Sequence, residues 1–397
     1  MAERRDIVIA GAGIGGLTAA LALAARGFRT VVCERAERLS EVGAGIQLTP
    51  NAGRILDALG LGEALSAAAS EPAAIDIHSA PSGRRLCSIP LAAMRVRHSC
   101  PWRVVARADL QSVLTAAVTV SSMIDLRLGT AVVDFAGGSG GSGDLLLGIE
   151  TRSGRTILPA AALVAADGVL SELRASLAGT TAARPIGSTA WRATVPARVL
   201  EAVPASRIGL WLGADAHLVH YPIAGGRTVN IVAIVAEDWR GIGWSEPGDH
   251  YWLAERFAAW APLAQRIIGA PAEWRKWAIL AVDPAGPWVS DRVALLGDAA
   301  HAMPPYLAQG AAMAIEDAAV LAGCFAASPD DPTEALRSYQ SWRRPRALKV
   351  YKAAFDAGEV YHFNSSMAAA RNMALRVAGR QVTLARNDWI YGWRAVV

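Results

Sequence analysis

The chain has few cysteines, and none of them are paired in sequence. Its four cysteines are widely spaced, with no Cys-x-x-Cys pair of the kind that binds zinc or carries dithiol chemistry: Cys33, Cys87, Cys100 and Cys324. We therefore expect free thiols, a reducing cytoplasm as the location, and no metal site.

Long apolar runs and an excess of one charge are also lacking. Arg, Glu or Gly interrupts every apolar segment before the roughly 18 residues that a membrane-spanning helix needs. Four glycines break the apolar stretch after Met1–Arg5, which argues against a signal peptide. The net charge is only +4, and basic residues are scattered among acids instead of forming a stripe along which phosphates bind. We expect no membrane insertion and no nucleic-acid partner.

The first 34 residues predict a strand, a glycine turn, a helix and a second strand. Gly11 permits the tight turn, Gly13 allows the backbone to approach a pyrophosphate, and Gly16 lets the helix pack on the strand. Glu34 ends the second strand about 20 residues later, where a carboxylate binds ribose hydroxyls. An acid there disfavours a 2′-phosphate, so the spacing indicates FAD or NAD.

Later segments return to the same α/β pattern. Leu163–Arg174 predicts a buried strand, a turn and a helix that Ser171 caps. Arg292–Leu296 predicts a buried strand closed by Gly297 and Asp298, where ligands of open α/β sheets bind. The Ala-rich helix expected over 310–326 has few charges and must be buried. In a chain of 397 residues with 53% hydrophobic composition, two or more domains have room for substantial cores.

The middle of the chain has a different character. Alternation over Ile75–Leu91 predicts a hairpin, and strands near 125–135 and 145–151 flank a glycine- and serine-rich loop, 137–143. Eight of the 13 tryptophans fall within Gly187–Ala281, which favours an antiparallel sheet with an aromatic pocket, most of these rings filling the core. The segment 334–397 reads as helical. We expect its cations on solvated faces: Arg337, Arg343, Arg344, Arg346 and Lys349.

Two features stay ambiguous on the residues alone. Gly43 and Gly45 read equally well as backbone held close to a flat ligand and as a loop before a helix that begins at Pro50. Arg107, near another predicted helix start, is either a diphosphate contact or a surface arginine paired with an acid.

Taken together, the motifs resemble the single-component FAD-dependent aromatic hydroxylases, the family of para-hydroxybenzoate hydroxylase. The glycine motif with Glu34, the Asp167–Gly168 motif, and Gly297–Asp298 occur in the family's order along almost the whole chain. The resemblance is greatest to the branch that acts on salicylate, 3-hydroxybenzoate and 6-hydroxynicotinate, through the segments 45–51 and 308–310.

The resemblance implies an α/β fold with a discontinuous Rossmann-like FAD-binding domain, a second and mostly antiparallel substrate domain, and a helical C-terminus. The expected boundaries are 1–74 with 101–180 and 284–330 for FAD, 75–100 with 181–283 for substrate, and 331–397 for the C-terminal helices. It implies cofactor contacts at Gly11, Gly13, Gly15, Gly16, Glu34, Arg35, Gly45, Arg107, Asp167, Gly168, Arg174, Gly297, Asp298, Gln309, Gly310 and Ala311.

A hydroxylase of this kind needs a base near the substrate hydroxyl, because a phenolate accepts oxygen better than a phenol does. In a strand over 217–221, His217 and Tyr221 share one face while His220 points to the other. The alternative is a hydrogen-bonded sheet histidine beside a core tyrosine. The resemblance implies catalytic roles for His217, Tyr221 and Tyr306, and substrate contacts at Gln47, Arg192 and Pro305.

The implied activity is hydroxylation of a small phenolic or hydroxy-heteroaromatic acid with NADH or NADPH and O2, through a flavin hydroperoxide. Two alternatives remain open: hydroxylation or epoxidation of a larger apolar or quinone-precursor substrate, and a flavin electron carrier or redox sensor that never oxygenates. We expect FAD as the bound cofactor, the nicotinamide cofactor as a transient co-substrate, and a monomer or homodimer.

Overall fold

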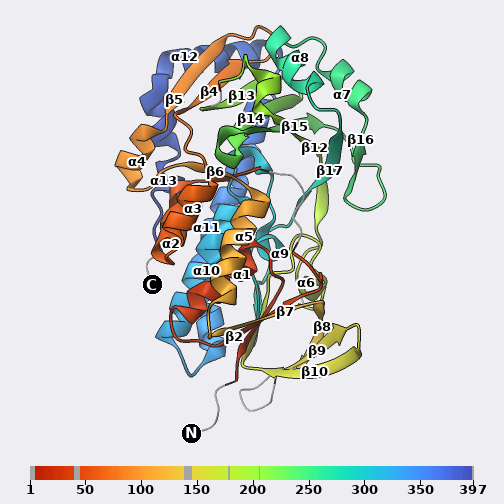
Figure 1. Ribbon diagram of the computed structural model, residues 1–397, viewed down its shortest axis with the longest axis vertical. Coiled ribbons are helices and arrows are strands. Elements are labelled where there is room, and N and C mark those ends of the chain that lie inside the picture. Colours follow the sequence, from red (N-terminus) through yellow and green to blue (C-terminus); the bar gives the residue numbers. More distant parts are fainter. Residues whose placement is uncertain (1–4, 40–44, 138–144, 178, 205, 396–397) are drawn as a thin grey trace.

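The computed structural model describes residues 5–39, 45–137, 145–177, 179–204 and 206–395. Most of the predicted glycine- and serine-rich loop, and Gly43, lie outside the described residues. Four sheets and a set of long helices form one elongated molecule (Figure 1).

The N-terminal motif builds the centre of a six-stranded sheet. Its strand order is β18-β19-β11-β1-β2-β7, parallel except for the edge pair β18-β19. Its strands are β1 (Ile7–Ala10), β2 (Thr30–Glu34), β7 (Ile124–Leu128), β11 (Ala162–Ala165), β18 (Val289–Ser290) and β19 (Val293–Leu295). β1 and β11 are fully buried because helices cover the sheet, as continuous apolar strands require. Helices α1 (Ile14–Ala24) and α5 (Arg107–Thr119) contact its strands, and α10 (Gly310–Ala327) packs on α1.

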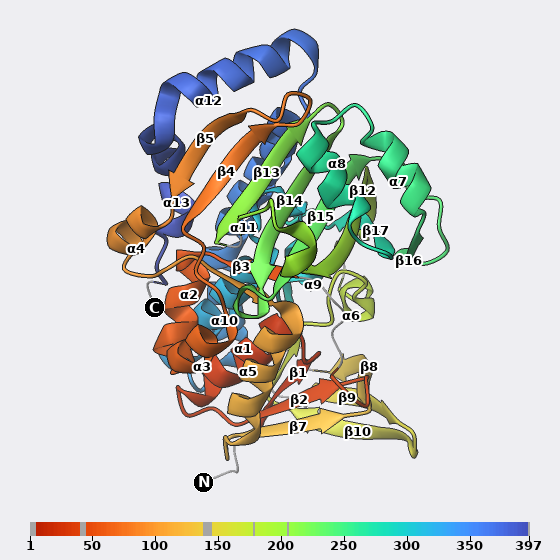
Figure 2. The same cartoon turned by 45° about the horizontal axis from the view of Figure 1, so that its top comes forward.

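The tryptophan-rich region forms an eight-stranded sheet, ordered β16-β17-β12-β15-β14-β13-β4-β5 and antiparallel except at β13-β4 (Figure 2). Its strands are β4 (Ala74–Ser79), β5 (Arg85–Pro90), β12 (Arg184–Pro196), β13 (Arg207–Gly213), β14 (Ala216–Ile223), β15 (Thr228–Ala236), β16 (Ser245–Gly248) and β17 (Trp274–Ala281). The predicted hairpin over 75–91 is confirmed as β4-β5. Trp191 and Trp211 are 1% exposed and fill the core on the sheet's outer face.

Two smaller sheets complete the strands. The predicted segment 125–135 contains two strands of different sheets, because Gly129, at φ 62°, turns the chain between β7 and β8. An antiparallel sheet contains β8 (Thr130–Gly137), β9 (Leu145–Thr151) and β10 (Gly154–Ala160). A two-stranded sheet pairs β3 (Gly45–Leu48) with β6 (Arg103–Ala106) and lies between the two large sheets.

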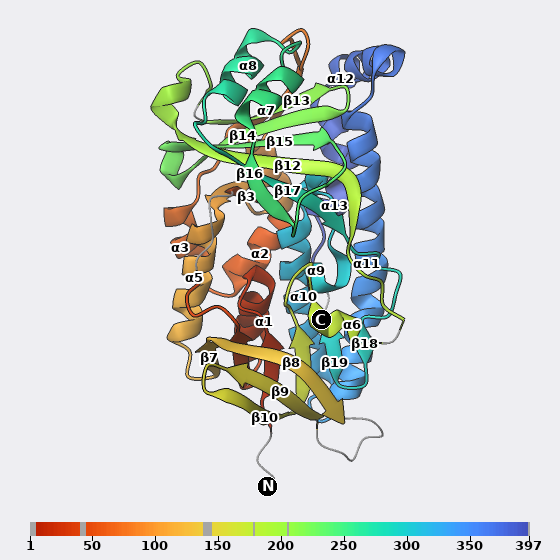
Figure 3. The same cartoon turned by 90° about the vertical axis from the view of Figure 1, so that its right-hand side faces the viewer.

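The other helices are short, apart from two at the C-terminus. The short elements are α2 (Pro50–Ala58), α3 (Gly62–Ala68), α4 (Ala92–His98), α6 (Glu172–Ala175), η1 (Ala197–Leu200), η2 (Ala224–Gly226), α7 (His250–Arg256), α8 (Pro262–Gly269), α9 (Asp298–His301), η3 (Pro305–Leu307) and α13 (Asp388–Tyr391). The long helix α11 (Pro332–Tyr361) runs from the parallel sheet to the eight-stranded sheet (Figure 3), and α12 (Ser365–Arg386) packs against β5.

Among the described residues, α10 is long and apolar enough to cross a bilayer, yet 72% of it is buried inside the protein. It packs between α1, α2 and α11, as expected for a core helix. Two acids interrupt its apolar sequence at the centre: Glu316 and Asp317, both fully buried.

The expectation that the C-terminal arginines are solvated is wrong for two of them. Arg343 is fully buried and donates to Glu316 at 2.8 Å and to Asp317 at 2.7 Å, and Arg346, 9% exposed, also donates to Glu316. Two buried carboxylates of α10 need these cations, since an unpaired buried charge is costly. Arg337, Arg344 and Lys349 are exposed, as expected.

Removing the buried cation should therefore destabilise the fold. We expect Arg343→Met to lower the free energy of unfolding by about 3–5 kcal/mol, because it leaves two carboxylates in the interior with too few partners. Arg344→Met, at an exposed neighbouring position of α11, should change it by less than about 0.5 kcal/mol. Urea unfolding of both holoproteins measures the difference, and equal midpoints would contradict the role assigned to Arg343.

Candidate active site

The glycine turn between β1 and α1 leaves one side open to a ligand. Gly11 has φ 107°, and a Cβ added there would lie 2.5 Å from the carbonyl oxygen of Ala166. A Cβ at Gly16 would collide with the Gly11 carbonyl, and one at Gly15 would lie 2.8 Å from Leu296. A Cβ at Gly13 would meet nothing within 4 Å. The space beside Gly13, at the N-terminus of α1, is where a phosphate group has access to free N–H groups.

The far side of this turn is held by Glu34 and by a residue that the sequence did not indicate. Glu34 accepts hydrogen bonds from the backbone N–H groups of Ala12 and Ala36 at 2.8 and 2.9 Å, and its exposed neighbour Arg35 follows β2. Gln111 of α5 donates to the Ala12 carbonyl at 3.2 Å, one helical turn after half-buried Arg107. The spacing of four residues places Gln111 on the same face of α5 as Arg107, and this spacing is the sequence signal that could have identified it.

The Asp167–Gly168 turn follows β11 and lies next to the glycine turn. Ser171 caps α6, as predicted, accepting from the Arg174 N–H at 2.9 Å. Asp167 accepts from the Leu173 N–H through Oδ2, whereas its Oδ1 is buried with no hydrogen-bond partner among the described residues. Burial raises the pKa of Asp167. The Arg174 guanidinium donates to the carbonyls of Ala299 and Val169, so it ties this turn to α9.

The third motif brings two elements together. Exposed Asp298 begins α9, and its Oδ1 lies 3.9 Å from where a Cβ on Gly310 would be; Gly310 and Ala311 begin α10. Gly297 has φ 64°, which suits glycine, and donates its N–H to Asp317 at 3.0 Å. The side chain of Gln309 is 1% exposed and donates to Thr49 at 3.1 Å, so its amide is directed into the protein interior.

Behind these turns lies a buried polar network that the sequence did not indicate. Asn51 donates to Gln309 at 3.1 Å and to Glu316 at 2.7 Å, and His301 contacts Asp317 at 2.6 Å. Burial alone would raise the pKa of Asp317, but the adjacent His301 and Arg343 lower it to about 2. The network links α2, the 308–310 segment and α10, and its Asp317 stays ionised at neutral pH.

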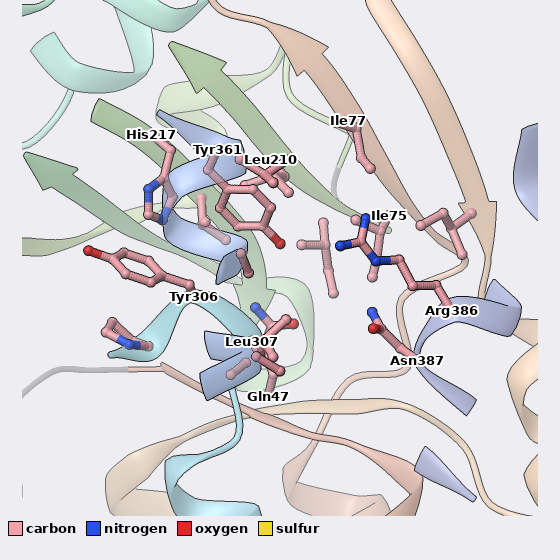
Figure 4. A pocket seen from close by; sticks show the side chains of 18 of the residues that line it. Gln47, Ile75, Ile77, Leu210, His217, Tyr306, Leu307, Tyr361, Arg386 and Asn387 are labelled. Carbon is pink, nitrogen blue, oxygen red and sulfur yellow. The ribbon is translucent and has the colours of Figure 1, made fainter. Parts of the chain in front are cut away.

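A cavity of about 360 Å³ lies between the eight-stranded sheet, η3 and the C-terminal helices (Figure 4). Four predicted site residues line it: Gln47, His217, Pro305 and Tyr306. Tyr221 does not line the cavity, because it packs beneath Gly45, where a Cβ would lie 2.5 Å from its ring. Arg192 also lies outside the lining, 5.4 Å from the Trp277 ring centre.

The aromatic residues of the cavity come from outside the tryptophan-rich region. None of its eight tryptophans is among the lining residues. The rings in the lining instead belong to Trp102, Tyr306, Tyr361, Trp389 and Tyr391. The predicted antiparallel sheet is confirmed, whereas the aromatic pocket depends on η3 and the C-terminal helices.

His217 is paired with a second histidine. Its Nδ1 lies 2.8 Å from Nε2 of His362, which follows α11, and its ring meets those of Tyr306 and Tyr361 edge-on with ring centres 5.4 Å apart. Burial, and then the neighbouring His362, hold the pKa of His217 well below 6.5. Burial lowers the pKa of His362 to about 4, although the nearby negative charge of Asp215 acts to raise it. Both rings are therefore neutral at pH 7.

The two predicted strand faces of β14 are confirmed. His217 lines the cavity, whereas His220 lies on the opposite face, against Gly209, and burial lowers its pKa to about 4. Tyr306 donates to Ser188 at 3.4 Å, and burial raises its pKa.

Comparison with known proteins decides the family. Residues 4–354 match the family model described as FAD binding domain. The chain is 35% identical to 3-hydroxybenzoate 6-hydroxylase 1 of Aquipseudomonas alcaligenes over 98% of both chains. It is 32% identical to 6-hydroxynicotinate 3-monooxygenase of Bordetella bronchiseptica, covering 90% of this chain and 92% of that one. The chain belongs to the FAD-dependent aromatic hydroxylases.

Solved structures show the same fold. A variant of Klebsiella pneumoniae HpxO in complex with FAD superposes with a TM-score of 0.85, at 26% identity and 98% coverage of both chains. Salicylate hydroxylase in complex with its substrate has a TM-score of 0.82 at 24% identity, covering 98% of this hydroxylase and 96% of that chain. The predicted family, fold class and FAD cofactor are confirmed.

Two features of this hydroxylase fit an extended dinucleotide such as FAD. The open space at Gly13 suits a pyrophosphate, and the partnerless Oδ1 of Asp167 and the exposed carboxylate of Asp298 are acceptors for ligand hydroxyls. Among the described residues, no group of three His, Cys, Asp or Glu side chains is arranged to hold a metal ion.

Filling the space at Gly13 should separate FAD binding from folding. Gly13→Ala adds a Cβ that touches no protein atom at φ −71°, so the apoprotein should keep its thermal midpoint. The same Cβ should weaken FAD binding about 5- to 150-fold, equivalent to about 1–3 kcal/mol of overpacking. Gly16→Ala is the matched variant that should destabilise the apoprotein itself. Titration of apoprotein with FAD tests both, and unchanged affinity in Gly13→Ala would refute the assigned pyrophosphate position.

Proposed function

We propose that this hydroxylase acts on a small phenolic or hydroxy-heteroaromatic acid, with NADH or NADPH and O2. The observation that carries the proposal is the position of the cavity. His217, Gln47 and the 305–308 segment line it, and this segment leads directly into the Gly310 turn of the nucleotide site. The names of the similar 3-hydroxybenzoate and 6-hydroxynicotinate enzymes support the substrate class.

We propose that FAD lies across the three turns. The pyrophosphate would rest on Gly11–Gly16 with Arg107 nearby, and Glu34 would bind the ribose of the nucleotide end beside Arg35. Asp167, Asp298 and the backbone of 309–311 would bind the ribityl chain and the ring end. When bound, FAD would supply the redox chemistry: two electrons from the nicotinamide cofactor would reduce O2, so that one oxygen atom enters the aromatic ring and the other leaves as water. The protein supplies position and proton transfer.

His217 is the proposed base, and its proton arrangement decides whether it can act. If its Nδ1 donates to His362 Nε2, the other ring nitrogen, Nε2, carries a lone pair that can accept the substrate's hydroxyl proton. With the opposite arrangement, Nε2 carries a hydrogen and donates. The first arrangement is the one that turns a phenol into a phenolate.

His362 gives the accepted proton a way out. When His217 Nε2 takes a proton, Nδ1 passes its own proton to His362 Nε2, so the charge does not remain on a ring that is 2% exposed. His362 is only half-buried, and its backbone carbonyl accepts from the N–H of exposed Asp215 at 3.4 Å, so a carboxylate and solvent are near. His362 therefore acts through His217.

The remaining predicted residues take different parts in the proposal. Tyr306 and Pro305 form the floor near His217, and Gln47 offers an amide to a polar substituent. Tyr221 supports β3 from beneath Gly45, so we assign it no proton transfer, and Arg192 stays a proposed substrate residue without a place in the cavity lining. We further propose a cytoplasmic monomer or homodimer.

One observation favours the larger apolar substrate as a second candidate. The lining is mostly aliphatic and aromatic away from His217. No comparable observation favours the electron carrier or redox sensor, which would not need an apolar cavity beside the nucleotide site.

Substrate-stimulated oxidation of NADH or NADPH tests the function. A panel of hydroxybenzoates and hydroxypyridines should contain compounds that accelerate flavin reduction and yield a hydroxylated product in step with the nicotinamide cofactor consumed. Product analysis by mass spectrometry with ¹⁸O2 identifies the inserted atom. Reduction that is equally fast without any aromatic compound, and no product, would favour the electron carrier.

Three histidine variants test the proton route. His217→Ala should lower coupled turnover roughly 100- to 10,000-fold while FAD content stays normal. His362→Asn should cause a smaller loss, and His220→Ala, on the opposite face of β14, should keep turnover in the folded fraction.

The pH profile adds an independent check. Because burial lowers the pKa of both His217 and His362, the neutral, proton-accepting pair persists above about pH 4. The kcat/KM profile should therefore show no loss with a pKa near 6.5 as pH falls. A wild-type rate in His217→Ala together with inactive His220→Ala would show that the other strand face carries the base.

A further inference from the structure

The cavity is longer than a single ring requires. Its volume of about 360 Å³ is more than twice the roughly 150 Å³ of an apolar cavity that accommodates benzene. His217, Tyr306 and Tyr361 stand at one end, and Arg386 and Asn387 at the other (Figure 4). A hydroxylated ring beside His217 therefore leaves the remainder of the cavity unfilled.

The wall between these two ends is aliphatic. Ile77 of β4 and Ile208, Leu210 and Leu212 of β13 are at most 9% exposed, and Ile75 extends the same wall toward Arg386. Adjacent parallel pairing of β4 with β13 places these side chains on one face of the sheet. No donor or acceptor is offered along this stretch, so it suits an apolar chain and disfavours a polar one.

Arg386 is the only guanidinium or ammonium among the described lining residues. It is exposed, in the last turn of α12, with no ion pair to a described acid. The other charged lining residue is Asp356 of α11, which repels a carboxylate. Burial raises the pKa of Tyr361 to about 12, and the charge of Arg386 opposes that rise, which places the guanidinium within electrostatic reach of the cavity. A carboxylate beside His217 would therefore lie at the opposite end of the cavity from the one cation among the described lining residues.

We propose that the substrate is an elongated aromatic acid: a hydroxylated ring at His217, an apolar spacer along the Ile75–Leu210 wall, and a terminal carboxylate on Arg386. Hydroxyarylalkanoic acids are the chemical class. The inference rests on the proposed function and assigns its substrate's acid group to a residue of the C-terminal helices.

Binding to the oxidised holoenzyme tests the inference without turnover. Calorimetric titration with hydroxybenzoate, hydroxyphenylacetate, hydroxyphenylpropanoate and hydroxyphenylbutanoate should show affinity rising roughly fourfold per added methylene until the cavity is filled. The carboxamide of the best ligand should bind about tenfold more weakly than the acid.

Two pairs of variants locate the subsite. Arg386→Gln should abolish the preference for acid over carboxamide, whereas Arg376→Gln, an exposed arginine of the same helix outside the lining, should keep it. Ile75→Phe should remove the gain from the longer spacer but keep hydroxybenzoate binding. Val377→Phe, at 80% exposure on α12 and outside the lining, should keep both the spacer gain and hydroxybenzoate binding.

The outcomes separate the two proposals. Affinity that falls with spacer length overturns the inference, and so does an acid preference that survives in Arg386→Gln. In either case, turnover of hydroxybenzoate would still support the proposed function. If no aromatic acid of any length stimulates oxidation of the nicotinamide cofactor by the FAD-loaded protein, the function fails and the inference falls with it.

Discussion

Two adjacent carboxylates in the core helix α10 set the constraint on which the nucleotide site depends. Glu316 and Asp317 are fully buried, and charges in such surroundings are tolerated only when paired and hydrogen-bonded. Arg343 satisfies both, and Arg346 adds a second cation to Glu316. The C-terminal helix α11 must therefore dock on α10 in one register, because a shift would leave charges unpaired.

The same carboxylates fix the turns around the ligand. Asp317 accepts from the Gly297 N–H, so the turn that carries Asp298 is held from inside the protein. Glu316 accepts from Asn51, which in turn donates to Gln309, so the segment before α10 is held as well. One ionic cluster thus couples the packing of the C-terminal helices to the shape of the cofactor site, and Arg174 joins the remaining turn to α9.

The parts of the fold that depend on local pattern could be predicted from the sequence. The β1–α1–β2 unit, the Ser171 cap and the opposed faces of His217 and His220 follow from neighbours a few residues apart. The environment of Arg343 could not be predicted, since nothing near it distinguishes an exposed helix arginine from one whose partners lie 26 and 27 residues away.

In the candidate site, too, contacts between segments distant in sequence could not be predicted. The sequence identifies His217 as a base candidate, but its hydrogen-bond partner His362 is 145 residues away in sequence. The lowered pKa of His217 follows from its burial in the folded protein and from this partner, and neither can be read from neighbouring residues. Tyr221 shares the face of His217, yet the approach of Gly45 covers it. Periodicity gives the face of a strand, but it does not show which part of that face another segment will cover.

Burial gives the proposed base both its advantage and its difficulty. An apolar cavity limits the contact of the reacting ring with water, and for the same reason it disfavours the protonated imidazole that a base must become. A single buried histidine would keep too low a pKa to hold the proton of a phenol. A second imidazole 2.8 Å away, closer to solvent and to Asp215, lets the positive charge leave the cavity without admitting water to it. In the proposed mechanism, the pairing of His217 with His362 is thus the feature that makes an apolar cavity compatible with proton removal.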